Sequence, residues 1–126
     1  MPKIVPQLPG IPPSRYPFSE VVEANGFVFL AGQVGDVPGR PGAVPGGIEP
    51  ETRAMLDNVG RLLRAVGLDY ADVVKCTVYL RDFGEFGAMN AVYREYFPTE
   101  PPTRATVGVT ALAEDFRVEI EVMAAR

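Results

Sequence analysis

Apolar residues recur along this chain at two different spacings, and segments with one spacing alternate with segments that have the other. Helical spacing of three and four residues occurs twice, in 50–66 and in 82–97. Around these segments lie short stretches rich in β-branched residues, with the period of two that places alternate side chains on one face of a strand. This alternation restricts the chain to folds in which helices pack on a β-sheet.

The helical segments carry start and stop signals. Pro50 suits the first turn of the first helix and Gly67 its end, while Pro98 ends the second. Asp82 and Glu85 have the spacing of an N-terminal cap and a side chain that reaches back to it. The buried stripes are predicted to be Met55, Leu56, Val59, Leu62, Leu63 and Val66 in the first helix, and Phe86, Met89, Val92, Tyr93, Tyr96 and Phe97 in the second.

The remaining periodic segments are predicted as strands. PFSEVVEANGFVFLAGQV contains two strands around Asn25-Gly26, a pair that accepts the positive φ angles of a tight hairpin turn. Further strands are expected over 72–80, 104–110 and 116–123. In the last, Phe116, Val118, Ile120 and Val122 share one face, and Arg117, Glu119 and Glu121 share the other. The order β-β-α-β-α-β-β predicts an α+β fold with both helices on one face of a mixed sheet.

At 126 residues the chain is predicted to be a single domain, residues 1–126. The Pro/Gly-dense stretch 35–47 is expected to be a long loop, because neither flanking part is large enough to stand alone. The sheet face opposite the helices carries Phe27, Phe29, Tyr79 or their neighbours. Such a face tends to be a partner surface, so self-association into a closed ring or dimer is expected.

Composition excludes several classes of function. The net charge of −4 disfavours nucleic acid, because such binding depends on Lys and Arg neutralising phosphates. No long basic run suggests a membrane surface, and the proline-broken N-terminus lacks the apolar region of a signal peptide. The lone Cys76 cannot form an internal disulfide, which agrees with a cytoplasmic location.

The sequence contains no histidine, which removes Ser–His–Asp and Cys–His catalysis and nearly every His-based metal site. The carboxylates form no spaced cluster, and the Gly-rich loop has no phosphate-binding motif. We therefore predict neither a metal nor a cofactor. Any chemistry must use carboxylates, arginine, tyrosine, hydroxyls, backbone groups and water.

The segment PPTRATVGV places Arg104, Thr106 and Gly108 on one strand face. One large cation among small residues is unusual for a solvent face. A guanidinium presents parallel donors that match a carboxylate, so Arg104 is a candidate anchor for a small anionic ligand. The alternative is a surface ion pair with a neighbouring Asp or Glu.

Glu119 lies on the non-core face of the last strand. If the last two strands pair through the connector ALAED, Arg104 and Glu119 project from the same side of the sheet. A carboxylate there can position water against an electrophilic carbon and pass a proton. Alternatively, Glu119 neutralises Arg104 or Arg117.

The segments VVKCTVYLRDFGEFGAMNAVYREYFP, PPTRATVGV, VEIEVMA and PFSEVVEANGFVFLAGQ together resemble the Rid (YjgF) family of enamine/imine deaminases, over about 17–124. The resemblance implies a chorismate-mutase-like fold and a homotrimer with a pocket between neighbouring subunits. It implies hydrolysis of a reactive 2-enamino or 2-imino acid to a 2-keto acid and ammonia. In that reaction Arg104 holds the substrate carboxylate, and Glu119 is linked to the attacking water.

The chain departs from the family pattern at two positions. Phe18 stands where the family commonly has Tyr, and Ala31 where it commonly has Ser, so two pocket hydroxyls are missing. Thr106 is within the pattern, and Ala31 and Gly32 are expected to offer backbone N–H groups. These substitutions predict a ligand with a more apolar side chain.

Two other functions remain open. A trimer that binds a keto acid or related metabolite without turnover agrees with the missing hydroxyls. A ribonuclease, an activity attributed to some relatives, is disfavoured by the acidic charge and the absence of histidine. Cys76 is expected to share a buried face with Val74, Val78 and Leu80 as an inert thiol. Asn90, Tyr93 and Tyr96 are assigned to structure or an interface.

Overall fold

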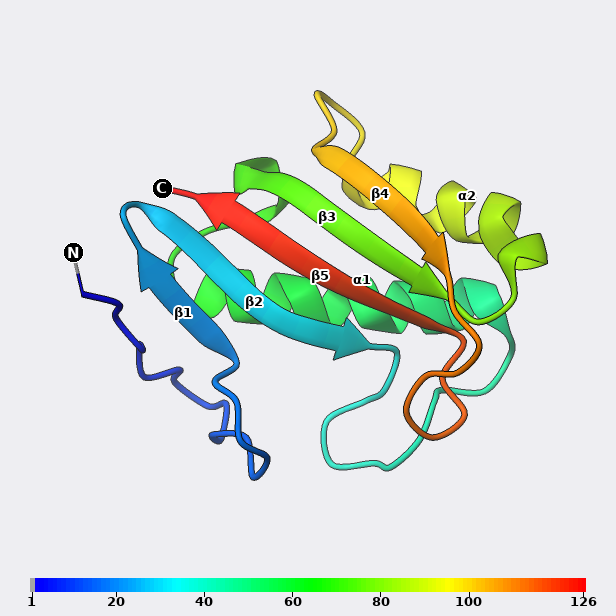
Figure 1. The fold of residues 1–126 in the computed structure, drawn as a ribbon, viewed down its shortest axis with the longest axis horizontal. Coiled ribbons are helices and arrows are strands. Elements are labelled where there is room, and N and C mark those ends of the chain that lie inside the picture. Colours follow the sequence, from blue (N-terminus) through cyan, green and yellow to red (C-terminus); the bar gives the residue numbers. More distant parts are fainter. Residues whose placement is uncertain (1) are drawn as a thin grey trace.

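The computed structural model describes residues 2–126. Its five strands form one sheet in the order β1-β2-β5-β3-β4, which can be followed across Figure 1. The strands are β1 (Val21–Ala24), β2 (Phe27–Val34), β3 (Val73–Leu80), β4 (Thr103–Gly108) and β5 (Val118–Ala125). All neighbours are antiparallel except β3 and β4, so the sheet is mixed, as predicted.

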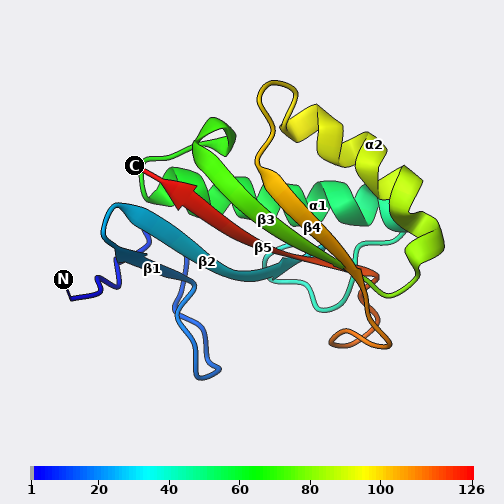
Figure 2. The same cartoon turned by 45° about the horizontal axis from the view of Figure 1, so that its top comes forward.

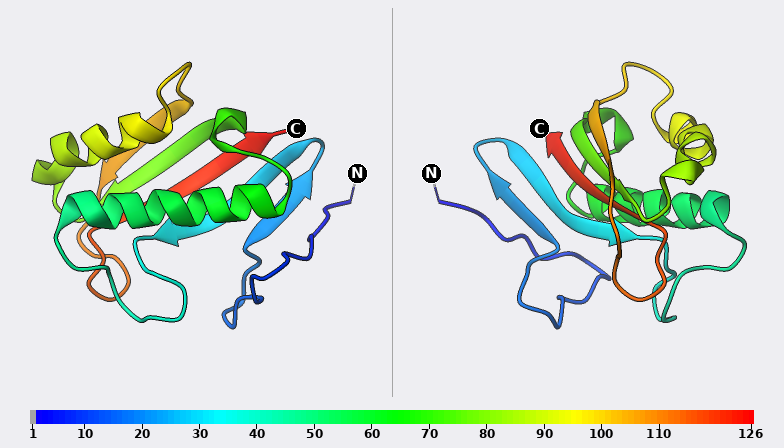
Figure 3. Two further views of the ribbon diagram at one scale, coloured as in Figure 1. Left: turned by 180° about the vertical axis from the view of Figure 1, so that it is seen from behind. Right: turned by 45° about the vertical axis from the view of Figure 1, so that its right-hand side comes forward.

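Helices α1 (Ile48–Ala65) and α2 (Phe86–Tyr96) cover one face of this sheet. Figure 2 and the left-hand view of Figure 3 show both on the same side, with α1 under the centre and α2 beside the β4 edge. The α+β fold class and the placement of both helices are therefore confirmed. Within residues 2–126, no helix is long and apolar enough to cross a membrane.

The β1–β2 hairpin turns at the predicted place. Asn25 and Gly26 have φ angles of 53° and 82°, which only residues tolerant of left-handed backbone adopt without strain. The turn pairs Val21 with Leu30 and so places both side chains in the core. A change of register by one residue would expose both, which is why the hairpin has a single pairing.

The core lies between the helices and the sheet. The α1 stripe is buried as predicted, and it packs on the inward-facing residues of β2 and β5. In α2 the stripe is buried at Met89, Val92, Tyr93 and Phe97, while Phe86 and Tyr96 are partly buried. The inward-facing sheet residues include Val118, Ile120, Val122, Cys76, Val78 and Leu80.

The expectation that the last two strands pair with each other is wrong. β5 lies between β2 and β3, whereas β4 lies at the sheet edge and pairs only with β3 within residues 2–126. The physical reason is burial: β5 has three consecutive inward residues that are almost fully enclosed, which requires a neighbouring strand on each side. β4 carries half-buried and exposed residues, as an edge strand does.

The strand boundaries differ from the predictions by one or two residues. β3 begins at Val73 rather than residue 72, β4 spans 103–108 rather than 104–110, and β5 spans 118–125 rather than 116–123. Val74 is 40% exposed because the β3–β5 register shifts between Val73 and Lys75, so it does not share the face of Cys76. This bulge puts Val73 in the core instead.

The predicted reciprocal cap at Asp82 and Glu85 forms only in part. The Asp82 side chain accepts a hydrogen bond from the Gly84 backbone N–H at 2.9 Å and caps the 3₁₀ turn Phe83–Glu85. Glu85 does not reach back, because its carboxylate pairs with Arg117 at 2.8 Å. The helix therefore starts one turn later than the sequence suggests, at Phe86.

A buried carboxylate joins the first helix to the sheet. Glu51 of α1 is 1% exposed, and its Oε2 accepts hydrogen bonds from the backbone N–H groups of Arg117 (2.6 Å) and Val118 (3.3 Å). A Cβ at Gly35 would overlap the Glu51 carbonyl oxygen, so the chain leaving β2 passes directly over this residue. Glu51 thus fixes the start of β5, just before Glu119.

The other sheet face has no helix on it. Phe27 and Phe29 of β2 are 43% and 40% exposed there, and Tyr79 of β3 is half-buried on the same face. The mixed apolar and polar character predicted for this face is present. It is the side from which Glu119 projects.

Candidate functional site

Arg104 projects from β4 toward α2, on the helix-covered side of the sheet. Its in-register partner on β3 is the buried Cys76, and partners in register share a face. The guanidinium carbon lies 4.6 Å from the centre of the Tyr93 ring and 5.6 Å from that of Phe86. These cation–π contacts hold the guanidinium by its flat face, which leaves the N–H groups at its edge available.

The space beside Arg104 is a hollow of 270 Å³ between α2 and the start of β4. Within residues 2–126, no Asp or Glu forms a salt bridge with Arg104. The surface ion pair considered as its alternative is therefore absent from the described chain. The hollow is lined by Asn90, Tyr93, Arg94, Phe97, Pro101, Pro102 and Arg104.

Two polar atoms near Arg104 are buried without a hydrogen-bond partner. They are the Tyr93 hydroxyl, on a residue only 7% exposed, and the Asn90 Oδ1. Burial raises the pKa of Tyr93 well above its usual value, so its hydroxyl keeps its proton. The sequence assigned both residues to structure or an interface, and the unpartnered atoms become visible only in the structure.

Cys76 of β3 lies next to Arg104 and is fully buried. Burial is the main cause that raises the pKa of its thiol, to about 11, so little thiolate forms at neutral pH. The prediction of an inert, buried thiol agrees with this environment.

Glu119 occupies the other side of the sheet, near the start of β5. Its register partners are Tyr79 on β3 and Val34 on β2. The carboxylate lies against Gly32, where a Cβ would overlap its Oε2. A glycine at position 32 is therefore required for the Glu119 side chain to lie in this position.

A β-bulge in β2 creates this contact. The β2–β5 register shifts between Leu30 and Gln33, so Ala31 and Gly32 together occupy one position in the ladder. The Ala31 N–H already donates to the Glu20 carbonyl at 2.8 Å, so it does not remain available to a ligand as the sequence suggested. The Gln33 amide contacts the carbonyl oxygens of Ala31 and Gly32 at 3.0 and 3.3 Å and so supports the bulge.

The electrostatic environment favours the protonated form of Glu119. Partial burial is the main cause that raises its pKa, and the negative charge of Glu121 adds to the effect. Glu121 itself accepts a hydrogen bond from the Tyr79 hydroxyl at 2.6 Å. Glu119 forms no salt bridge with any side chain in residues 2–126, which excludes neutralisation by Arg104 or Arg117 in the described chain.

Arg104 and Glu119 do not meet within one chain. Arg104 shares the inward face with Cys76, whereas Glu119 shares the outward face with Tyr79. The expectation that both project from one side of the sheet is therefore wrong. It failed because β3 separates β4 from β5, and antiparallel pairing between those two strands was its premise.

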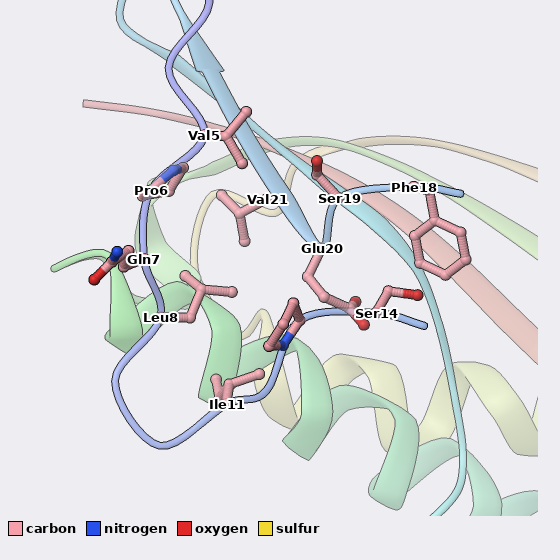
Figure 4. Close-up of a pocket in the computed structure, with 11 residues that line it drawn as sticks. Val5, Pro6, Gln7, Leu8, Ile11, Ser14, Phe18, Ser19, Glu20 and Val21 are labelled. Atoms are coloured by element: carbon pink, nitrogen blue, oxygen red, sulfur yellow. The ribbon is translucent and has the colours of Figure 1, made fainter. Parts of the chain in front are cut away.

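The remaining predicted residues divide between the two sides. Thr106 is half-buried on the Arg104 face, opposite the buried Val78. Ala31 and Gly32 lie beside Glu119. Phe18 is 51% exposed, stacks on Tyr16 with ring centres 6.4 Å apart, and lies at the rim of a separate hollow, labelled in Figure 4.

No group of three or more His, Cys, Asp or Glu side chains within residues 2–126 is arranged to hold a metal ion. The chemistry available to this arrangement is thus anion binding by Arg104 on one face and proton transfer by a carboxylate on the other.

Comparisons with known proteins identify similar chains. The family model described as Endoribonuclease L-PSP matches residues 11–126. The goat (Capra hircus) protein named 2-iminobutanoate/2-iminopropanoate deaminase is 42% identical over 108 residues, which cover 86% of this chain and 79% of that protein.

Solved structures give the same result. YyfA of Yersinia pestis, described as a member of the Rid protein family, is 32% identical with a TM-score of 0.91, covering 99% of this chain and 100% of that one. Escherichia coli TdcF with bound serine is 33% identical with a TM-score of 0.83, covering 91% of this chain and 92% of that one. The resemblance found in the sequence is confirmed.

Proposed function

Because the chain belongs to the Rid (YjgF) family, we propose that it hydrolyses a reactive 2-enamino or 2-imino acid to a 2-keto acid and ammonia without a cofactor. A relative that is 42% identical is named as a deaminase of 2-iminobutanoate and 2-iminopropanoate, which supports this class of reaction. The structural observation that carries the proposal is the unpaired guanidinium of Arg104, held over Tyr93 beside an open hollow.

Arg104 binds the substrate carboxylate. Its two parallel N–H donors match the two carboxylate oxygens, and the aromatic ring beneath it keeps the guanidinium plane fixed. The unpartnered Tyr93 hydroxyl and the half-buried Thr106 lie on the same face and supply further polar groups near this anchor. Binding at one end then orients the imine carbon for attack.

Glu119 handles the water. Attack of water on the protonated imine forms the C–O bond while the Glu119 carboxylate takes one water proton, which leaves a carbon that bears a hydroxyl and an amino group. Glu119 then returns that proton to the nitrogen. The C–N bond breaks, its electron pair leaves with ammonia, and the hydroxyl proton passes to water as the carbonyl forms. A raised pKa makes the Glu119 carboxylate a stronger base in the first step. It also keeps the carboxyl group protonated closer to neutral pH, as the second step requires.

A complete site requires two chains. Arg104 and Glu119 point in opposite directions from strands separated by β3, and strands two positions apart are about 10 Å apart. A small imino acid does not span that distance through a sheet. This geometry supports a homotrimer in which Arg104 of one subunit faces Glu119 of the next, and exposed Phe27 and Phe29 supply apolar area for the contact.

The preferred substrate carries a more apolar side chain than a pocket with two hydroxyls would select. Phe18 and Ala31 offer no hydroxyl to a ligand, while Gly32 allows close approach beside Glu119. Phe18 is assigned to the substrate pocket as an aromatic wall contributed across the subunit interface. Comparison of short polar with longer apolar imino acids tests this preference.

The central experiment generates 2-imino acids in situ with an amino-acid oxidase and measures the release of keto acid and ammonia. The protein should accelerate release, and Arg104→Ala should reduce kcat/KM about 100-fold, since a charge-assisted contact is lost. Arg61→Ala removes an equal charge from an exposed position on α1 and should leave the rate unchanged. Glu119→Gln should lower kcat while substrate binding persists.

Equal release with and without protein contradicts the deaminase proposal. The non-catalytic binder is the second candidate, because the hydroxyls at positions 18 and 31 are missing. It predicts that a 2-keto acid still binds and that Arg104→Ala abolishes this binding. Calorimetric titration with 2-oxobutanoate measures it directly.

A further inference from the structure

The N-terminal segment borders a second hollow at the β1 edge of the sheet, opposite the β4 edge that carries Arg104. Ile4 and Glu23 exchange two backbone hydrogen bonds, each 2.8 Å long, so the segment runs along the free edge of β1. Leu8 and Ile11 then pack against the core. Between this segment and β1 lies a space of 430 Å³, within the size range of small-molecule sites (Figure 4).

The walls of this N-terminal hollow are mostly apolar. Figure 4 shows Leu8, Val21 and Ile11 on one side and the Phe18 ring on the other. Its apolar lining residues are Val5, Pro6, Leu8, Ile11, Pro13, Phe18 and Val21. A ligand with an apolar body would lose water contact on entry, which favours binding.

Glu20 is the only charged residue in this lining. It is half-buried, and its side chain runs down from the start of β1 toward the segment that carries Ser14. Its Oε1 accepts one long hydrogen bond from the Gln33 amide at 3.3 Å. No Lys or Arg within residues 2–126 forms a salt bridge with it, so one carboxylate oxygen is left for a donor from outside the chain.

Two hydroxyls accompany the carboxylate. Ser14 accepts the Tyr16 backbone N–H at 3.1 Å and retains a second lone pair on Oγ, and Ser19 also lines the hollow. The polar groups beside Glu20 are therefore neutral and able to accept hydrogen bonds. No cation within the lining would attract an anion.

We propose that the N-terminal hollow binds a small organic cation, a protonated primary amine attached to an apolar body. The ammonium group donates to Glu20 and Ser14, and the apolar body lies against Leu8, Ile11 and Val21. A half-buried carboxylate without a cationic partner favours such a ligand over a neutral one of the same shape. The hollow shares the Phe18 wall with the proposed substrate pocket, but its ligand contacts include neither Arg104 nor Glu119.

The test uses the full-length protein and 2-phenylethylamine as probe. Two-dimensional NMR of the methyl groups should show saturable shifts at Leu8, Ile11 and Val21, at a concentration where 2-phenylethanol and 3-phenylpropanoate cause none. The alcohol keeps the apolar body without the charge, and the acid reverses the charge. Loss of the charge-assisted contact in Glu20→Gln should weaken binding about tenfold or more.

A matched control separates local from global charge effects. Glu49→Gln removes the same charge at an exposed position on α1 and should leave amine binding unchanged. Equal binding of amine and alcohol, equal weakening by both variants, or no methyl shifts at millimolar amine would each overturn the inference. Deamination is not part of this readout, so loss of either proposal leaves the other standing.

Discussion

Arg104 and Glu119 project from opposite faces of one sheet, with β3 between their strands. Each is free of a salt bridge within residues 2–126, and each lies beside a feature that fits a ligand: an aromatic ring under Arg104 and a glycine under Glu119. Whether the two residues can act on one substrate therefore depends on how the chains assemble.

Mixing two inactive variants should restore activity. Arg104→Ala supplies intact Glu119, and Glu119→Gln supplies intact Arg104. In trimers assembled at random from equal amounts, about a quarter of interfaces join one intact Arg104 to one intact Glu119. Deaminase activity after joint denaturation and refolding should reach about that fraction of wild type. A mixture as inactive as either parent would place both residues in sites within single chains.

Gly32→Ala should impair the Glu119 half of the site. The new methyl group overlaps Oε2 of Glu119 and forces the carboxylate away from its position over the bulge. We expect kcat to fall and the KM for substrate to change little, because Arg104 is untouched. Gly87→Ala is the control, since a Cβ there meets nothing within 4 Å. A Gly32→Ala enzyme with wild-type kcat would separate Glu119 from the chemistry.

Glu119→Gln should become more stable relative to wild type as the pH rises. Burial raises the pKa of Glu119, so the folded state favours the protonated form. The stability from this group is complete below the unfolded pKa of about 4.5 and is lost as the pH rises through the higher folded value. Glutamine does not ionise. Urea midpoints of both proteins between acidic and neutral pH should diverge in this direction, and a constant difference would contradict it.

Glu51→Ala should destabilise the fold by about 1–3 kcal/mol, because two backbone N–H groups at the start of β5 lose their acceptor. Glu51→Gln keeps an acceptor oxygen and should cost less. Chemical denaturation measures both. Equal stability of the Ala variant and wild type would mean that water replaces the carboxylate at Arg117 and Val118.

Local patterns predicted most of the fold. Asn25-Gly26 gave the hairpin because its backbone requirement is local, and the α1 stripe was correct because helical spacing alone selects the buried face. The cap at Asp82 was only partly correct, since the attraction of Arg117 for Glu85 depends on a residue distant in sequence. The bulges at Val74 and at Ala31-Gly32 have no local signal that separates them from regular strand.

The sequence alone determined the element types, the buried face of the last strand, and the identity of Arg104 and Glu119 as candidates, because these follow from period and chemical type. The tertiary structure decided the order of strands in the sheet. That order depends on which strand buries most apolar area between two neighbours, a comparison among distant segments that no local window contains. It put β5 in the centre and β4 at the edge with β3 between them, and the register of each strand on β3 directs Arg104 to the helix-covered face and Glu119 to the other.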